Sequence, residues 1–179
     1  IAHDQRSAEL RGPQWCRLIT DEARDAVIAA AGDDPIRDDS TGEKAWAKIS
    51  RSGRSIASLL MDQSVTAGVG NIYRAEVLFR HRVNPFKEGR TISRRTWNAM
   101  WADLVLLMRD GVTEGRIDSV RDEHLPEAMG REPRVDRHGG EVYVYRRAGQ
   151  PCLVCATPVR TQVLEGRNLY WCPRCQRRR

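Results

Sequence analysis

Four cysteines near the C-terminus have the spacing of a metal site. They form two Cys-x2-Cys pairs with sixteen residues between the pairs. The residues are Cys152, Cys155, Cys172 and Cys175. Four thiolates complete a tetrahedral zinc site and leave no position for water or substrate, so such a site is structural rather than catalytic. We therefore predict one structural Zn²⁺, with iron or four unliganded thiols as the alternatives.

The residues between the cysteine pairs predict a β-hairpin. Residues 159–164 and 168–171 flank the turn Glu165-Gly166-Arg167, which presents Arg167 at the tip. Backbone amides and a guanidinium at such a tip can together approach a phosphate, although an arginine in solvent fits the same pattern. A module this small needs the metal to fold. Replacing Cys172 by Ser is therefore expected to unfold the zinc module and spare the rest.

A second pattern, Gly68-Val69-Gly70-Asn71, stands directly before a predicted helix. Glycines allow a ligand to approach the backbone closely, and the free amides at a helix N-terminus attract anions. Asn71 can cap the helix and also donate to a phosphate. The pattern predicts an anion site, and an ordinary turn between two helices is the alternative.

The charge distribution favours a phosphate-bearing partner. The 179 residues carry a net charge of +6, and residues 146–179 hold eight arginines against one acid, whereas residues 1–40 hold five arginines against nine acids. Only Lys44, Lys48 and Lys87 are lysines. The guanidinium fork suits phosphate better than an ammonium does, although a coding bias toward arginine would give the same composition.

Hydropathy argues against a membrane protein. Mean hydropathy is −0.58, and no apolar run approaches the ~20 residues that a membrane span needs. The N-terminus does not have the pattern of a secretory signal. We therefore expect a cytoplasmic protein with reduced thiols, associated with the nucleoid if its source is bacterial.

Hydrophobic periodicity predicts a mainly helical chain that ends in the zinc hairpin. Thr20, Ser55, Asn71 and Ser93 are the expected N-caps. The expected elements are helices over 20–31, 42–49, 55–65, 71–84 and 93–114, a strand over 5–11 ending at Gly12-Pro13, loops over 33–39 and 116–140, and a strand over 141–145. The second helix is expected to bury Ala45, Trp46 and Ile49, and Cys16 is expected to serve packing.

The segment from Met61 to Phe79, followed by the two cysteine pairs, resembles the formamidopyrimidine-DNA glycosylase and endonuclease VIII family. The first segment resembles the helix-two-turn-helix motif of that family, and the second resembles its C-terminal zinc finger. The variant Tyr170-Trp171-Cys172-Pro173 is closer to the endonuclease VIII branch.

The resemblance implies a function and a division into domains. Asn71 and Arg167 would contact DNA phosphate, with Gly68 and Gly70 in the same contact loop. Residues 1–12 would be the end of an N-terminal β-sandwich, 13–140 the helix-two-turn-helix domain and 141–179 the zinc finger. The expected partner is double-stranded DNA, damaged or abasic, bound by a monomer. The expected function is the DNA-binding portion of a base-excision-repair glycosylase and AP lyase that removes oxidised bases.

The resemblance also implies a catalytic amine that these 179 residues lack. Family members use an N-terminal proline followed by glutamate, whereas this chain opens Ile1-Ala2-His3. We therefore expect a portion of a longer enzyme, with no catalytic residue in these 179 and no activity alone. A stand-alone zinc-containing DNA-binding protein without catalysis and a protein-binding zinc module are the alternatives.

Overall fold

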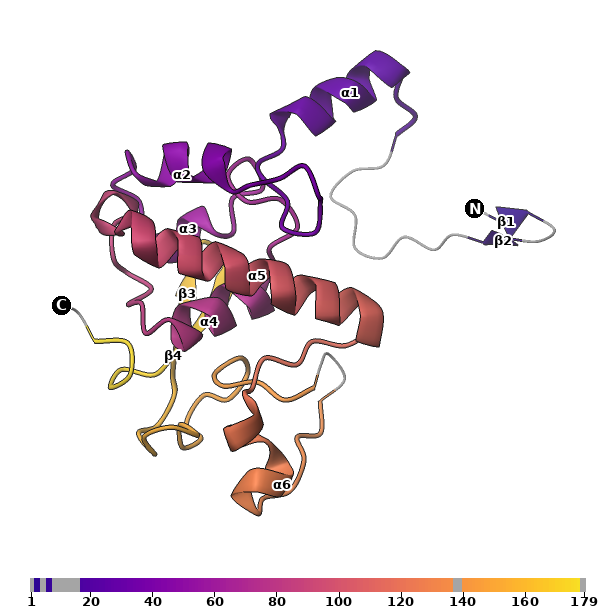
Figure 1. Cartoon of the computed structure of the whole chain (residues 1–179). Coiled ribbons are helices and arrows are strands. Elements are labelled where there is room, and N and C mark those ends of the chain that lie inside the picture. The colour runs from indigo at the N-terminus through magenta and orange to yellow at the C-terminus, as the bar shows by residue number, and fades with distance from the viewer. Residues whose placement is uncertain (1, 4–5, 8–16, 137–139, 178–179) are drawn as a thin grey trace. The chain divides into compact units, whose positions relative to one another are not determined.

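The computed structural model describes residues 2–3, 6–7, 17–136 and 140–177 (Figure 1). Backbone contacts divide the chain into two compact units, residues 1–30 and residues 31–179. The second unit contains the remaining helices and the zinc hairpin. The division of the sequence at residues 12 and 140 stays a prediction.

The first unit contains two very short strands and one helix. Strands β1 (Ala2–His3) and β2 (Arg6–Ser7) pair antiparallel, and α1 (Asp21–Ala30) begins at the predicted cap, where the Thr20 hydroxyl accepts a hydrogen bond from the Ala23 N–H at 3.3 Å. The predicted strand over 5–11 is described only at Arg6–Ser7. The Gly12-Pro13 turn and Cys16 lie outside the described residues.

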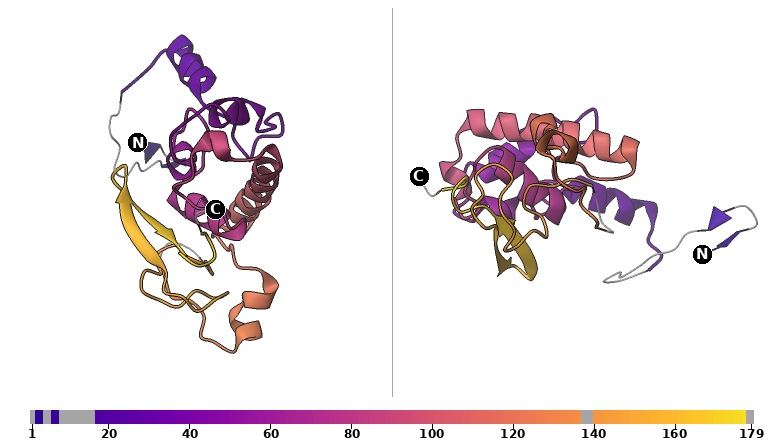
Figure 2. Two further views of the ribbon diagram at one scale, coloured as in Figure 1. Left: turned by 90° about the vertical axis from the view of Figure 1, so that its left-hand side faces the viewer. Right: turned by 90° about the horizontal axis from the view of Figure 1, so that it is seen from below.

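The second unit is mainly helical with one antiparallel hairpin, as predicted. Its elements are α2 (Glu43–Ile49), α3 (Ile56–Leu59), α4 (Asn71–Arg80), the 3₁₀ turn η1 (Gly89–Thr91), α5 (Arg94–Glu114), the 3₁₀ turn η2 (Asp122–His124), α6 (Pro126–Met129), β3 (Arg160–Leu164) and β4 (Arg167–Trp171). Helix α4 contacts both α5 and β4, and Figure 2 shows the hairpin and α5 on opposite sides of it. No helix in the described part of the chain is long and apolar enough to cross a membrane.

The core of this unit forms around α5. One apolar face of α5 is buried, with Trp97, Met100 and Leu104 at most 1% exposed. Two hairpin residues, Leu169 and Trp171, belong to the same cluster of buried side chains. Because the hairpin contributes to the helical core, its folding is coupled to that of the helices.

A close backbone approach fixes the start of α2 against α5. Gly42 has φ +79°, and a Cβ atom there would lie 2.6 Å from the Trp101 ring. The carbonyl of Gly42 also accepts a hydrogen bond from the Trp97 indole at 3.1 Å. Trp46 was expected to be buried but is only partly buried. It lies at the edge of the core, where the Arg94 guanidinium covers its ring at 5.4 Å from the centroid.

Helix α3 is much shorter than predicted. Its cap at Ser55 is confirmed, since the hydroxyl accepts a hydrogen bond from the Ser58 N–H at 3.1 Å, but the continuation to residue 65 is wrong. The Asp62 carboxylate accepts from both the N–H and the hydroxyl of Ser64, at 3.1 and 2.7 Å. This local turn replaces further helical hydrogen bonds, as short polar side chains often do.

Helix α4 ends at Arg80 rather than near residue 84. Arg82 takes the left-handed conformation, with φ +54°. The Val83 N–H bonds the Leu78 carbonyl and the Arg82 N–H bonds the Phe79 carbonyl, both at 2.9 Å. This is a Schellman motif, in which glycine usually occupies the position held here by Arg82.

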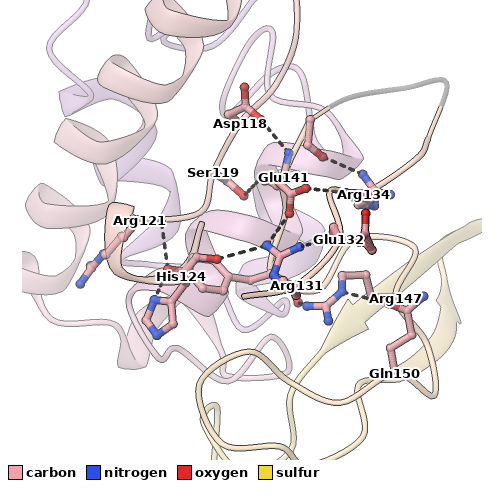
Figure 3. Close-up of polar contacts among 12 residues, drawn as sticks. Asp118, Ser119, Arg121, His124, Arg131, Glu132, Arg134, Glu141, Arg147 and Gln150 are labelled. Carbon is pink, nitrogen blue, oxygen red and sulfur yellow. Dashed lines mark hydrogen bonds and ion pairs between the residues drawn. The ribbon is translucent and has the colours of Figure 1, made fainter. Parts of the chain in front are cut away.

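The described parts of the segment over 116–141, residues 116–136 and 140–141, include short helical elements and are not a plain loop. It contains η2 and α6, and the Glu141 carboxylate holds it by accepting hydrogen bonds from the Arg131 guanidinium and from the Arg134 N–H (Figure 3). The Ser119 N–H bonds the Glu141 carbonyl at 2.9 Å. The strand predicted over 141–145 is absent from the described structure, because its amides bond a buried carboxylate instead of another strand.

A partly buried ion pair links α4 to α5 and gives a pH-dependent prediction. The Asp103 carboxylate, 12% exposed, accepts two bonds of 2.7 Å from Arg80 and one of 3.1 Å from His81. Burial alone would raise the pKa of Asp103, but these hydrogen bonds hold it at about 2. Because this folded-state pKa lies below the unfolded value, the stabilisation is full above about pH 4 and is lost as pH falls toward 2.

We expect Asp103→Asn to lower the free energy of unfolding by about 2 kcal/mol at pH 7. Denaturant unfolding at several pH values should show this difference shrinking below pH 4. The control is Asp38→Asn. Asp38 pairs with Arg109 of α5, but the Asp38 side chain is 96% exposed, so we expect almost no change in the free energy of unfolding. Equal effects of the two substitutions would contradict the assignment.

Candidate zinc centre and nucleic-acid interface

The four predicted cysteines come together in the structure. Their sulfur atoms all lie within 4.8 Å of one another, with Cys152 and Cys175 separated by 3.9 Å and Cys155 and Cys172 by 3.5 Å. A tetrahedral zinc with Zn–S bonds of ~2.3 Å needs sulfur separations of about 3.8 Å. The donor set and its geometry therefore fit one structural Zn²⁺.

Burial affects how the thiols take up metal. Burial raises the pKa of the Cys152 thiol above its usual range, which favours the protonated form. Zinc displaces that proton on binding, and acid opposes zinc uptake.

A buried glutamine connects the second cysteine pair to the end of α4. The Gln176 side chain, 1% exposed, accepts a hydrogen bond from the Cys172 N–H and donates one to the Val83 carbonyl, both at 2.9 Å. Asn84 in turn donates to the Gln176 carbonyl at 2.8 Å. The orientation of the zinc site is thus fixed by the loop that follows α4.

The middle of α4 is connected to the zinc module by Glu76, which is fully buried. Its carboxylate accepts hydrogen bonds from the backbone N–H groups of Tyr143, Val144 and Tyr145 at 2.7–2.9 Å. The Ser119 hydroxyl donates a fourth, at 2.6 Å. Four donors satisfy a carboxylate that would otherwise be costly to bury.

At its N-terminus α4 meets the hairpin through Asn71. Asn71 is the first helical residue rather than the predicted cap, since Gly70 occupies the cap position. The Asn71 side chain donates to the Asn168 carbonyl at 2.9 Å and accepts from the Arg74 guanidinium. Asn71 therefore connects two motifs that are 97 residues apart in sequence.

Arg167 lies next to this junction. The hairpin turn has two residues, Glu165 and Gly166, both with positive φ, so Arg167 is the first residue of β4, paired with Leu164, rather than part of the turn itself. Its side chain is exposed and forms no hydrogen bond or ion pair with any described residue. A free guanidinium thus stands beside the N-terminus of α4.

The two glycines before α4 have different roles. Gly68 has φ +76°, which favours glycine, and its N–H bonds the Gln63 side chain at 2.9 Å. Gly70 has an ordinary φ, and a Cβ atom there would meet nothing within 4 Å. Gly70 directly precedes the first turn of α4, whose N–H groups have no partner within the helix.

Arg74 makes this region strongly positive. Its guanidinium is 1% exposed, and its Nε has no hydrogen-bond partner among the described residues. Burial lowers the pKa of Arg74 to about 10; Glu165 opposes that shift, whereas the positive charge of Arg167 adds to it. At neutral pH the N-terminus of α4 therefore holds two neighbouring guanidinium charges.

Sequence reasoning missed four residues that build these connections. They are Arg74, Glu76, Asn168 and Gln176. The signal for the first two was available, because a basic and an acidic residue interrupt the apolar positions of the helix over 71–80. No comparable signal marks Asn168, which contributes a backbone carbonyl, or Gln176, which looks like part of a basic tail.

The fold and the site together define a helix-two-turn-helix protein with a structural four-cysteine zinc finger. Residues 31–122 match the family model described as the formamidopyrimidine-DNA glycosylase H2TH domain. Residues 149–178 match the zinc finger found in FPG and IleRS. The chain belongs to the formamidopyrimidine-DNA glycosylase and endonuclease VIII family.

Individual relatives agree with this assignment. The chain is 49% identical over 171 residues to endonuclease 8 1 of Mycobacterium tuberculosis, covering 94% of this chain and 61% of the relative. It is 31% identical over 183 residues to formamidopyrimidine-DNA glycosylase of Prochlorococcus marinus, covering 97% and 63%. The chain thus spans about three fifths of the length of these relatives.

Solved structures share the fold. MutM (Fpg) of Thermus thermophilus aligns with a TM-score of 0.67 and 28% identity, over 87% of this chain and 57% of that one. A Lactococcus lactis FPG mutant in complex with Fapy-dG-containing DNA aligns with a TM-score of 0.68 and 22% identity, over 89% and 56%.

The packing of the hairpin changes the expectation for Cys172→Ser. Because Leu169 and Trp171 lie in the helical core, loss of one zinc ligand should destabilise the helices as well as the hairpin. We expect far-ultraviolet circular dichroism and tryptophan fluorescence to report one shared transition at a lower temperature, together with zinc release. Cys16→Ser, outside the zinc spacing, is the control. Two separate transitions would contradict this coupling and would show that the zinc module and the helices unfold independently.

We expect Glu76→Gln to lower the free energy of unfolding by about 2–4 kcal/mol, because an amide NH₂ must then face backbone donors. Chemical denaturation of the zinc-loaded chain measures the change. Glu123→Gln removes the same charge from a side chain that is 60% exposed and should change stability by less than about 0.5 kcal/mol. If Glu76→Gln is equally mild, Glu76 does not hold the segment 143–145.

Proposed function

We propose that this chain is the DNA-binding portion of a base-excision-repair DNA glycosylase and AP lyase that removes oxidised bases. In this proposal the residues described here bind the phosphates of damaged or abasic duplex DNA. The chain acts as a monomer in the cytoplasm, and its zinc orients the hairpin rather than taking part in chemistry.

The main observation behind the proposal is the hydrogen bond from the Asn71 side chain to the Asn168 carbonyl. This hydrogen bond aligns the amides at the N-terminus of α4 with the unpaired guanidinium of Arg167. Helix N-terminal amides and an arginine fork are both good donors to phosphate oxygens. Two elements from distant parts of the sequence thus offer convergent donors to one anion.

The positive field around Arg74 also supports phosphate binding. A buried guanidinium with an unpartnered Nε and a nearby second guanidinium is electrostatically unfavourable until an anion approaches. A DNA phosphate at Gly70 would supply that anion without steric hindrance. The Asn71 side-chain carbonyl accepts from Arg74 and one of its amide N–H groups bonds the hairpin, which leaves the second amide N–H for the phosphate.

The relatives are consistent with this activity. Those reported above are named as endonuclease 8 and as formamidopyrimidine-DNA glycosylase. Structural neighbours from Lactococcus lactis are complexes of Fpg with DNA containing Fapy-dG or an abasic site. The proposal extends the binding of such DNA from those proteins to this chain.

We expect Arg167→Ala to weaken binding to a duplex containing a stable abasic-site analogue. Because one phosphate contact is lost, the slope of log K against log salt concentration should become shallower by about 1. Fluorescence anisotropy at several salt concentrations measures both quantities.

The matched control is Arg160→Ala, since Arg160 is an exposed arginine at the other end of the same hairpin. It should leave the slope nearly unchanged. An unchanged slope for Arg167→Ala, or no duplex binding by the unsubstituted chain, would overturn the proposal.

A further inference from the structure

A second cluster of cations lies at the opposite end of α4 from Asn71. A cavity of about 650 Å³ opens between the loop that follows α4 and the two cysteine pairs. Four cationic side chains line it: Arg82, Lys87, Arg174 and Arg177. Of the described residues that line the cavity, none is aspartate or glutamate.

None of these four side chains forms a hydrogen bond or ion pair with a described residue. Several arginines elsewhere in the described part of the second unit do have carboxylate partners, among them Arg80, Arg109 and Arg131. Unpaired cations therefore gather at this cavity although acids are available elsewhere in the fold.

Two carboxylates close in sequence to the residues that line the cavity already have partners. Asp103 accepts from Arg80 and His81, and Glu88, which follows Lys87, is paired with Arg90 at 2.6 Å. Neither carboxylate is available to neutralise the cavity.

The zinc site accounts for only part of this charge. Zn²⁺ with four thiolates carries a net charge of −2, and Cys155 and Cys175 line the cavity. Four cations exceed that charge by two, so the cavity keeps a net positive charge that favours an anionic ligand.

The backbone conformation at Arg82 is unusual for a residue with a long side chain. Arg82 occupies the left-handed position of the Schellman motif, where glycine is favoured. An arginine at this position costs some helix stability and places a guanidinium at the rim of the cavity. Exchange for glycine would relieve the backbone and remove the charge.

The lining indicates the chemistry of the ligand. Guanidinium and ammonium groups suit phosphate oxygens, and the cavity is larger than a single phosphate requires. No phenylalanine, tyrosine or tryptophan ring is among the described lining residues, and His81 is the one aromatic ring among them, so the lining offers many charged donors and little surface for stacking a base. Two or more adjacent phosphates fit these properties better than a nucleobase.

We propose that this cavity is a second phosphate-binding site, which takes adjacent phosphates either of a nucleic-acid strand or of a free oligophosphate. It is separate from the site proposed at Asn71 and Arg167. Helix α4 has ten residues and is therefore about 15 Å long, and Arg82 lies beyond its C-terminal end. The two sites can be occupied independently.

The test uses nuclear magnetic resonance of the zinc-loaded chain, titrated with inorganic tripolyphosphate and, separately, with an oligothymidylate of about ten nucleotides. Backbone amides of 82–96 and 174–177 report on the cavity, and those of 68–73 report on the N-terminus of α4. The site variant is Arg82→Gly with Lys87→Gln. The matched control is Arg51→Gln with Lys44→Gln, which removes one arginine and one lysine from exposed positions outside the cavity.

We expect the site variant to weaken tripolyphosphate binding, measured at the cavity amides, by about tenfold, and the control to weaken it by less than about twofold. Thermal unfolding should show that both variants fold. If the oligothymidylate also shifts the cavity amides, the source of the phosphates is a strand; if only tripolyphosphate does, it is a free oligophosphate.

Equal weakening in the two variants would show an effect of net charge alone and would overturn the proposal. Absence of shifts at the cavity amides with both probes would also overturn it. Neither result bears on duplex binding at 68–73, so the failure of this proposal is distinct from a failure of the proposed function.

Discussion

The carboxylate of Glu76 has no contact with solvent and accepts four hydrogen bonds, three of them from successive backbone N–H groups at residues 143–145. A buried charge is tolerated only when its acceptor positions are filled. The chain before the first cysteine pair therefore has to turn around this side chain. That turn brings Tyr143 against Phe79, with ring centroids 4.6 Å apart, and sets where the zinc module begins.

Helix α4 and the loop that follows it carry the polar connections to the zinc module described above. Asn71 at its first residue bonds the hairpin, Glu76 in its middle bonds the segment before the cysteines, and Asn84 beyond its end bonds Gln176. Zinc supplies the local fold of the cysteine pairs, whereas α4 supplies their orientation. This separation of roles explains how a small metal-bound hairpin can hold Arg167 in a defined position relative to a helix terminus.

Sequence reasoning predicted the parts of the fold that depend on local chemistry. The zinc ligands, the long helix after Ser93 and the capped starts at Thr20 and Ser55 follow from spacing and capping preferences. The parts that it missed depend on tertiary contacts. A strand over 141–145 was predicted from alternation alone, because nothing local reveals that its amides bond a carboxylate 67 to 69 residues earlier.

The hydrogen bonds at the two ends of α4 limit where the chain can accept insertions or deletions. Helix α4 and strand β4 run in the same direction, joined by Asn71 to Asn168 at one end and by Asn84 to Gln176 at the other. The distance along the chain from residue 71 to residue 84 must therefore match the distance spanned by residues 168–176. An insertion or deletion within either stretch would break one junction, whereas the exposed turn at Glu165 and Gly166 lies outside the matched pair.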